Sequence, residues 1–502
     1  MYVVLFLFVL NFMSQLYRLS RLGDNFMSEK MLTEGGRVSK KEAWKYAFGI
    51  FGQNLSCALM MSWFFVFCTD VLYIEGKVIG IVLGIARIWD GVNDPLMGTL
   101  IDRHTFKNGE KFRPFLRLTP IVVGIIVIML FTDWGFKGDI PKAIYVLIFY
   151  LLYDMIFTIQ DVSMWSMTSV MTDVPEEREK LSQLGRILAA IGFAVVGVFP
   201  TIMDMLRSQG MSPQKIYFGA AVIFGFGGMI ISILSASAKE RIHVTEETKT
   251  ESFRENLKML FSNKIVMLVL LGNILNGLSL TVPGAYFFEH SVKATLFGKE
   301  IGGLTVMTIM TGIAYMFSGL GMFLVTSLSK KVGGMRNVLI WANVISVVTR
   351  VVAFLIGFEG NRIWIVTILF ALGSIPGQMF GIARTALWGD SIDYMEWKTG
   401  KRAEAITFAA QTFCDKISTA LNTVIAGFLL TWLEYDAEAI AAGASVSAKF
   451  QQWIWPLFMI GPAIGAALYI IPLLFIKYPQ SLKEQVTKDL HDRRMQKGEI
   501  VE

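Results

Sequence analysis

The sequence predicts an all-α membrane protein with twelve transmembrane helices arranged as two halves of six. Three observations predict this fold: 54% of the residues are hydrophobic and only 17% charged, apolar segments recur along the chain, and one charge-dense stretch interrupts them midway. A mean hydropathy of +0.54 over 502 residues is typical of a polytopic membrane protein and excludes a water-soluble globule. The net charge of +6 therefore does not indicate nucleic acid as a partner.

Each apolar segment is long enough to cross a hydrocarbon core of ~30 Å at ~1.5 Å per residue. The segments lie at roughly 46–72, 78–101, 114–133, 141–171, 185–206, 216–236, 264–288, 303–328, 336–358, 362–389, 403–432 and 452–476. We therefore expect an N-terminal six-helix half over 46–236, a central cytoplasmic loop over 237–263 and a C-terminal six-helix half over 264–476. This is the layout of the major facilitator fold.

Lys and Arg are concentrated in alternate loops, which predicts the orientation of the chain in the membrane. The positive-inside rule places these loops and both termini in the cytoplasm; the loops are 102–113, 173–184, 237–263, 329–336 and 390–402.

The two ends of the chain are expected to lie outside the bilayer. Residues 1–45 are interpreted as an N-terminal extension and cytoplasmic leader. Within them, residues 1–26 are interpreted as an upstream extension without function, because a start at Met27 leaves a polar, basic leader. The last residues, 477–502, alternate charges without an apolar stripe and are interpreted as a solvated cytoplasmic tail.

No residue pattern favours an enzyme. The cysteines Cys57, Cys68 and Cys414 lie inside apolar segments and show neither a disulfide framework nor metal-ligand spacing. The sequence contains no HExxH motif and no phosphate-binding glycine-rich loop. We expect no catalytic residue and no cofactor.

The second apolar segment carries charges on one helical face. Arg87, Asp90 and Asp94 follow one another at i, i+3 and i+7, with Asn93 beside them. A carboxylate at bilayer depth costs at least ~2.5 kcal/mol, so these side chains must face a cavity, a cation or a partner. A Na⁺ ion at Asp90 and Asp94, or a proton, fits this need. The alternative is an internal Arg87–Asp90 ion pair that locks two helices together.

The same segment ends in a short cytoplasmic motif. Gly98, Asp102 and Arg103 fit the G-x-x-x-D-R pattern that major facilitator proteins carry between spans 2 and 3, and SLSKKVGGMRN from Ser327 is a degenerate echo in the second half. Asp102 would act in a cytoplasmic latch, by capping a helix end or pairing with a basic residue.

The fourth segment predicts a sugar-binding face. Asp154, Thr158, Asp161 and Trp165 follow at i, i+4, i+7 and i+11 and therefore share one helical face. A carboxylate accepts hydrogen bonds from vicinal hydroxyls, and an indole stacks on the apolar face of a pyranose. The alternative is that Trp165 is a packing residue and Asp161 pairs with a basic neighbour.

Three motifs resemble the glycoside-pentoside-hexuronide:cation symporter family, whose best-known member is the melibiose carrier. They are RIWDGVNDPLMG with KFRPFL downstream, IQDVSMW, and GDSIDYMEWKTGKRAEAI. The resemblance implies a cation site, a sugar or coupling site, and a cytoplasmic ionic gate. The cation site would comprise Asp90, Asn93, Asp94 and Thr158; the sugar or coupling site Asp161, Trp165, Arg186, Gln411, Thr412 and Lys416; and the gate Arg178, Asp390, Asp393, Glu396 and Arg402, with Asp102 and Arg103 in the adjacent latch.

The chain departs from the melibiose carrier at positions that touch sugar. A Lys and Asp pair in span 1 is replaced by Gln53 and Asn54, and a tryptophan of span 10 is absent from GQMFGIAR. We interpret Asn54 as a substrate residue, and Asp154, which the carrier lacks, as a relocated substrate contact. The alternative for Asp154 is an ion pair with Arg350 in span 9.

The residues and the resemblance together predict a secondary symporter of the bacterial inner membrane. It would couple inward Na⁺ or H⁺ flow to uptake of a glycoside or oligosaccharide, act as a monomer, and bind a sugar and the lipid bilayer but no nucleic acid. Two alternatives are a lipid or lysolipid symporter on the same fold, against which Asp154 and Asp161 argue, and a non-transporting membrane sensor, which would need a large soluble domain.

Overall fold

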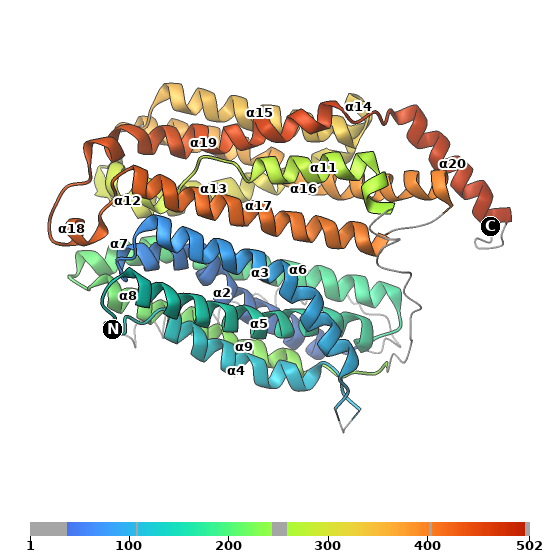
Figure 1. Cartoon of the computed structure of the whole chain (residues 1–502), viewed down its shortest axis with the longest axis horizontal. Coiled ribbons are helices and arrows are strands. Elements are labelled where there is room, and N and C mark those ends of the chain that lie inside the picture. Colours follow the sequence, from blue (N-terminus) through green and yellow to red (C-terminus); the bar gives the residue numbers. More distant parts are fainter. Residues whose placement is uncertain (1–37, 107–108, 243–258, 401–403, 497–502) are drawn as a thin grey trace. The chain divides into compact units, whose positions relative to one another are not determined.

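The computed structural model describes residues 38–106, 109–242, 259–400 and 404–496, which are almost entirely helical (Figure 1). The predicted all-α class is confirmed. A short antiparallel pair of strands, β1 (Ala294–Leu296) and β2 (Lys299–Ile301), joins two helices. The predicted N-terminal extension, residues 1–26, lies outside the described residues.

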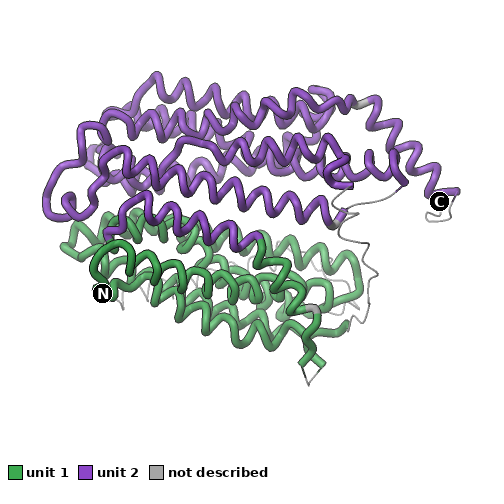
Figure 2. Tube along the Cα trace, viewed as in Figure 1, with its two compact units in different colours: residues 1–72, 92–246 green, residues 73–91, 247–502 purple. Residues whose placement is uncertain are grey.

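Contacts divide the chain into two compact units (Figure 2). Unit 1 comprises residues 1–72 and 92–246, and unit 2 comprises residues 73–91 and 247–502. The helices of unit 1 are α2 (Lys40–Asp70), α4 (Arg113–Leu130), α5 (Asp139–Met171), α6 (Pro175–Val196), α7 (Phe199–Ser208), α8 (Pro213–Ala220), a π-helical turn over Ala221–Gly227, α9 (Gly228–Ser232) and a 3₁₀ turn over Ile233–Ser237.

Helix α3 (Gly76–Arg103) contributes its first half to unit 2 and its second half to unit 1. The remaining helices of unit 2 are α11 (Lys264–Asn276), α12 (Gly284–Ser291), α13 (Gly303–Ser318), α14 (Leu320–Val332), α15 (Met335–Ile356), α16 (Arg362–Thr399), α17 (Glu404–Trp432), α18 (Ala437–Ala441), α19 (Ala448–Leu474) and α20 (Gln480–Gln496).

Helical structure lies at each of the predicted spans. Among the described residues, nine helices are long and apolar enough to cross a membrane, and the bent pair α13–α14 makes a tenth. The second predicted span is α3, which carries Arg87, Asp90 and Asp94 within its length. The seventh predicted span is divided between α11 and α12, because residues 277–283 are not helical. The membrane fold predicted from hydropathy is therefore confirmed.

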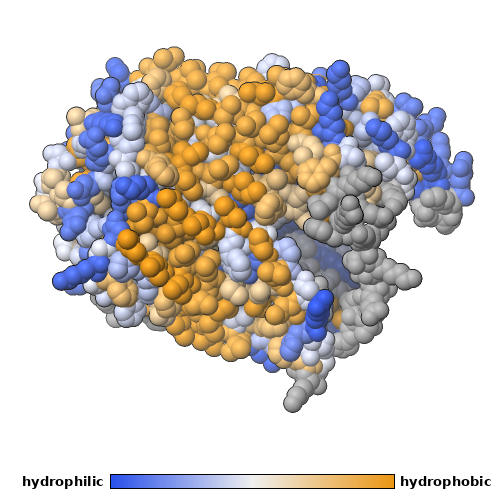
Figure 3. Space-filling model, in the orientation of Figure 1, coloured by the Kyte–Doolittle hydropathy of each residue, from blue (hydrophilic) through white to orange (hydrophobic). Residues whose placement is uncertain are grey.

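Hydrophobic side chains cover much of the visible surface along the helices, and hydrophilic ones gather towards the helix ends (Figure 3). Helix α15 illustrates the pattern: Trp341, Val348 and Leu355 are exposed and lie seven residues apart, on one face. Such a stripe is unfavourable in water and is expected of a helix that faces lipid tails.

The interior of unit 1 is formed by helices that approach closely. Gly52 of α2 and Gly228 of α9 face each other, and a Cβ atom on Gly228 would lie 2.6 Å from the Gly52 carbonyl oxygen. Small residues at a crossing let two membrane helices come into backbone contact. Tyr46 donates from its buried hydroxyl to the Met164 carbonyl at 2.7 Å, which ties α2 to α5.

Two glutamates hold the end of unit 1 at which α4 begins. Glu240 accepts from the backbone N–H groups of Lys111, Phe112 and Arg113 at 2.7–2.8 Å, so a carboxylate caps the start of α4. Glu42 accepts from Arg241 at 2.7 Å. The hydrogen bond with Glu42 raises the pKa of Arg241 above its ordinary value, so this pair stays charged at any physiological pH.

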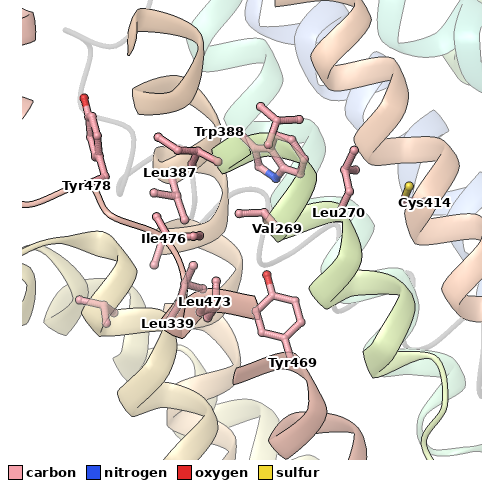
Figure 4. Close-up of a cluster of buried hydrophobic side chains, with 14 of the residues drawn as sticks. Val269, Leu270, Leu339, Leu387, Trp388, Cys414, Tyr469, Leu473, Ile476 and Tyr478 are labelled. Carbon is pink, nitrogen blue, oxygen red and sulfur yellow. The ribbon is translucent and has the colours of Figure 1, made fainter. Parts of the chain in front are cut away.

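The interior of unit 2 contains a large apolar cluster (Figure 4). Side chains from α11, α15, α16 and α19 point towards one another in it, including Val269, Leu339, Trp388, Tyr469 and Leu473. This packing fixes α16 and α11, which carry polar residues described below.

The first half of α3 packs on α17 through glycines. A Cβ atom on Gly76 would lie 2.7 Å from the Gly427 carbonyl oxygen, and one on Gly80 would lie 3.0 Å from Gly427 Cα. Because of this packing, residues 73–91 group with unit 2, whereas the sequence prediction assigned all of 46–236 to the N-terminal half. The predicted domain boundaries remain a prediction.

The predicted tail contains a helix, α20, that binds the end of α16. Lys483 and Arg494 form ion pairs of 2.8 Å with Asp390 and Glu396, and Trp397 donates to Asp489 at 2.7 Å. The sequence pattern did not indicate this docking, because the contacts are polar and the helix has no apolar stripe.

Candidate functional site

The polar face of α3 is brought against α5 within unit 1. Asn93 donates from Nδ2 to the Thr158 hydroxyl at 3.1 Å, and Thr158 donates in turn to Asp94 Oδ1 at 3.2 Å. Asn93 and Thr158 are buried. Three of the four predicted cation-binding residues thus lie in one hydrogen-bonded cluster.

This cluster leaves one buried oxygen without a donor. The Thr158 proton goes to Asp94, so the side of Asn93 that faces Thr158 must be its NH₂ group, which fixes the orientation of the amide. Asn93 Oδ1 is buried and accepts no hydrogen bond from any described residue. An orphaned carbonyl oxygen beside a carboxylate and a hydroxyl is a set of hard oxygen donors, which fits Na⁺.

The fourth predicted cation residue, Asp90, is paired within unit 2. Lys416 Nζ of α17 lies 2.8 Å from Asp90 Oδ1 and donates to the Asp90 carbonyl oxygen at 2.9 Å. The side chains are only 15–17% exposed, so this pair is largely withdrawn from water. Gly91 makes room for it, since a Cβ atom there would lie 2.8 Å from the Phe413 ring. Arg87 is not among the partners of Asp90 in the described part of the chain.

The predicted sugar face of α5 is held by a buried chain of amides. Gln53 of α2 donates to Asp161 Oδ1 at 2.5 Å, and its own carbonyl accepts from Gln160 at 3.3 Å. Gln160 also donates to Ser232 at 2.9 Å. Asp161 therefore has a fixed orientation, set by a residue that the sequence analysis treated only as a departure from the melibiose carrier.

The other predicted substrate residues of unit 1 lie on three helices. Trp165 packs on α6, where a Cβ atom on Gly185 would lie 3.4 Å from the indole, and the next residue, Arg186, is exposed. Asn54 donates to the Ile50 carbonyl at 2.8 Å within α2. Asp154 is buried, two helical turns from Asp161 along α5.

The predicted substrate residues of unit 2 lie along α17. Gln411 carries a buried Oε1 that accepts no hydrogen bond from the described residues, Thr412 is exposed, and Lys416 binds Asp90 as described above. Asp154 and Arg350 belong to different units, and the ion pair between them remains a prediction.

Three of the predicted gate residues, Arg178, Asp390 and Glu396, have partners within their own units. Arg178 donates from Nε to the Thr172 carbonyl at 2.9 Å, and Asp390 and Glu396 bind α20. Arg103 is exposed at the end of α3. Asp393 lies on α16 between the two paired acids. Arg402 and the side chain of Asp102 lie outside the described residues, so ion pairs across the halves remain a prediction.

A second ion pair, which the sequence pattern did not indicate, lies next to Lys416. Arg384 Nη1 of α16 lies 2.8 Å from Asp415 Oδ1, and Asn273 of α11 donates to the same oxygen at 2.9 Å. Helix α17 thus carries adjacent opposite charges whose partners lie on three different helices, α16 and α11 for Asp415 and α3 for Lys416. The sequence offered one signal for this pair: Arg384 and Asp415 both lie inside apolar spans, where a charged residue is rarely found without a partner.

The chain matches proteins of one class over nearly its whole length. A family model described as MFS/sugar transport protein matches residues 45–480. The isoprimeverose transporter of Lactiplantibacillus pentosus is 23% identical, covering 93% of this chain and 94% of that protein. The putative glycoside/cation symporter YagG of Escherichia coli (strain K12) is 25% identical, covering 87% and 91%. The crystal structure of nucleoside transporter NupG superposes with a TM-score of 0.57 at 15% identity, covering 87% of this chain and 100% of that chain, and supports the fold alone.

Proposed function

The chain belongs to the MFS/sugar transport protein family, and from this premise we propose that it is a secondary symporter of the plasma membrane. It couples inward flow of Na⁺ or H⁺ to uptake of a glycoside, an oligosaccharide or a related sugar by alternating access. Relatives described as an isoprimeverose transporter and as a putative glycoside/cation symporter support both the class of substrate and the coupling. The basic loops favour cytoplasmic termini.

The observation that carries the proposal is the cluster of Asn93, Asp94 and Thr158. It offers a carboxylate, a hydroxyl and an orphaned amide oxygen in a buried setting. A protein that only needed to stabilise its helices would satisfy this oxygen, because a buried unpaired acceptor costs about 1–3 kcal/mol. A bound cation removes that cost.

The Lys416–Asp90 pair supports a mechanism for coupling. The ammonium of Lys416 occupies two oxygens of Asp90, its carboxylate and its carbonyl. A coupling ion that uses Asp90 must displace this tethered cation, and the released Lys416 is then free to change partners. Because α17 also carries Gln411 and Thr412, a change in the partner of Lys416 would alter the position of the predicted substrate residues on that helix. By linkage, each ligand then raises the affinity for the other by the same factor.

Substrate recognition is assigned to the fixed carboxylate of Asp161. Gln53 donates to one oxygen of this carboxylate, and because a carboxylate has about four lone-pair sites, a sugar hydroxyl can donate to it as well. Trp165, one helical turn further along α5, offers an indole for stacking. Asn54, Asp154 and Arg186 are assigned supporting contacts with the sugar.

A cytoplasmic gate is proposed at the acidic end of α16. Asp390, Asp393 and Glu396 would exchange partners between α20 and the basic residues Arg178 and Arg402 during the transport cycle. Such pairs are individually weak where they are wet, about 0–1 kcal/mol, which suits a contact that must break in every cycle.

The proposal is tested in proteoliposomes with a panel of labelled glycosides and an imposed Na⁺ or proton gradient. Accumulation of at least one glycoside is expected only with the gradient. Asp94→Asn should abolish accumulation while part of the sugar binding survives, and Glu179→Gln, at a cytoplasmic surface residue, should leave uptake unchanged. Accumulation that persists without a gradient, or in both Asp90→Asn and Asp94→Asn, would exclude the assigned coupling.

A further inference from the structure

A cavity of about 510 Å³ lies inside unit 2, between α13, α15, α16 and α19. Its size is in the range of sites for small organic molecules. None of the predicted cation-binding or sugar-binding residues lines it. The cavity is lined by polar side chains, by three glycine or proline positions of α16 and by two phenylalanine rings.

Arg350 is the charged residue of this lining. It lies six residues before α15 ends at Ile356, about 9 Å along the helix, and therefore within an apolar span. Its guanidinium lies over the Phe370 ring, 5.4 Å from the centroid. No described carboxylate of unit 2 forms an ion pair with it. An arginine inside a span costs at least ~2.5 kcal/mol, and an unpaired one is expected to serve a ligand or a pathway.

Three hydroxyl groups of the cavity lining already donate to backbone carbonyls and can accept from an occupant. Thr349 donates to the Ile345 carbonyl at 2.8 Å, Thr311 to the Met307 carbonyl at 2.8 Å, and Ser374 to the Ala314 carbonyl at 2.7 Å. Each hydroxyl has a single proton, so only its lone pairs remain for an occupant. The cavity thus combines a cationic donor with several neutral acceptors.

This combination favours one kind of occupant. A metal cation is repelled by Arg350, and a neutral sugar leaves the guanidinium unpaired. A bare inorganic anion pairs with Arg350 but cannot donate to the hydroxyl oxygens. A molecule that carries both an anionic group and hydroxyl groups satisfies both sets, and a carboxylate or phosphate can accept two parallel N–H bonds from arginine.

We propose that this cavity is a binding site for a hydroxylated organic anion, whose carboxylate, sulfonate or phosphate binds Arg350. The anion stacks beside Phe370, and its hydroxyl groups donate to Thr349, Thr311 and Ser374. The site goes beyond the proposed symport, because it contains none of those residues and binding to it needs no ion gradient. Free acid sugars and the glycerophosphate headgroup of a lipid share this chemistry.

The test measures equilibrium binding to the full chain in phosphatidylcholine nanodiscs, in potassium buffer without sodium. The probes are methyl β-D-glucuronide and methyl β-D-glucoside, galacturonate and galactose, and glycerol 1-phosphate and glycerol. At least one anion should bind tenfold or more tightly than its neutral counterpart. Arg350→Gln should abolish the preference, Arg350→Lys should restore part of it, and Arg362→Gln, at an exposed arginine, should not change it.

Two glycines of α16 provide a matched test that leaves Arg350 in place. A Cβ atom at Gly377, in the cavity lining, or at Gly381, outside it, meets no atom within 4 Å. Gly377→Leu should fill the cavity and weaken anion binding at least tenfold, and Gly381→Leu should leave it unchanged. Equal loss in both variants would contradict the assigned position of the site.

Thiol labelling of Ser346→Cys, in the cavity lining, tests the charge selectivity without any particular sugar. A sulfonate-bearing methanethiosulfonate should react faster than a trimethylammonium one, measured against the Ser346 parent. The reverse order, or an anion preference retained in Arg350→Gln, would overturn the proposal. A double-variant result would also overturn it. If Asp154→Asn and Arg350→Gln each lower the yield of folded protein and the double variant restores it, the two residues form a structural ion pair. If phosphatidylglycerol in the nanodiscs competes with the bound anion, the lipid headgroup is the occupant. If it does not compete, the occupant is the free acid.

Because these measurements use no ion gradient, their failure would leave the proposed symport untouched, and loss of coupled uptake would leave this site untouched.

Discussion

Replacing Lys416 with glutamine should increase the affinity for the coupling ion. In the structure the ammonium lies 2.8 Å from Asp90 Oδ1 and also holds the Asp90 carbonyl oxygen. An incoming Na⁺ or proton that uses Asp90 has to displace this competitor. In Lys416→Gln the competitor is gone and the site gains one net negative charge, while the amide keeps a hydrogen-bond donor of similar length.

The expected size of the effect follows from the geometry. Unit charges this close attract by roughly 6 kcal/mol at an effective dielectric constant of about 20. Desolvation of both partners offsets most of this attraction, and a net gain of about 1.4–2.8 kcal/mol remains, or about 10-fold to 100-fold in ion affinity.

The assay is the ion concentration that gives half-maximal substrate binding to the purified protein, measured by titration with Na⁺ at fixed pH and by titration with protons without Na⁺. Lys449→Gln is the matched control, because Lys449 also pairs with a carboxylate, Glu434 at 3.6 Å, but at an exposed position. A half-maximal concentration that is unchanged or higher in folded Lys416→Gln would refute the displacement mechanism.

Three further variants test other parts of the account. Thr158→Val removes the hydroxyl between Asn93 and Asp94 and should weaken ion binding about tenfold, or ~1.4 kcal/mol, whereas Thr158→Ser should not; equal weakening in both variants would argue against the hydroxyl as a ligand. Gln53→Leu removes the hydrogen bond from Gln53 that orients Asp161 and should weaken glycoside binding several-fold at unchanged ion affinity; unchanged glycoside binding in titration calorimetry would argue against this orienting role. Glu240→Ala removes the acceptor of three N–H groups at the start of α4 and should destabilise the protein by about 1–2 kcal/mol, seen as a lower Tm than in the exposed control Glu179→Ala; identical Tm values would contradict the cap.

The membrane-spanning helices were predictable because lipid requires long apolar segments, and such segments are visible in the hydropathy of the sequence. The break in the seventh span was not. Residues 277–283 are as apolar as a helix requires, and their non-helical backbone depends on dihedral preferences around Gly277 and Pro283 that hydropathy does not register.

The arrangement along each helix was predictable, but the partners across helices were not. The spacing predicted that Asp94 lies on the charged face of α3, with Asn93 beside it. Their contact with Thr158 depends on how α3 and α5 pack, and spacing within one helix carries no information on that. The same holds for Gln53 with Asp161 and for Arg384 with Asp415, which pair residues from different helices.

The docking of α20 shows a third limit of sequence reasoning. A helix without an apolar stripe is expected to remain solvated, yet Lys483 and Arg494 bind acids of α16. Which charged residues pair is decided by the tertiary fold, and the sequence shows only that both signs are present.

The central claim, coupled symport, is tested most directly by the current that a substrate alone can drive. Proteoliposomes with equal ion concentrations on both sides are given an inward glycoside gradient, and charge movement is recorded on a solid-supported membrane. The account predicts a sustained inward positive current with at least one glycoside, and its loss in Asp94→Asn. Glycoside entry at the same rate without any current, in the wild-type protein, would contradict it.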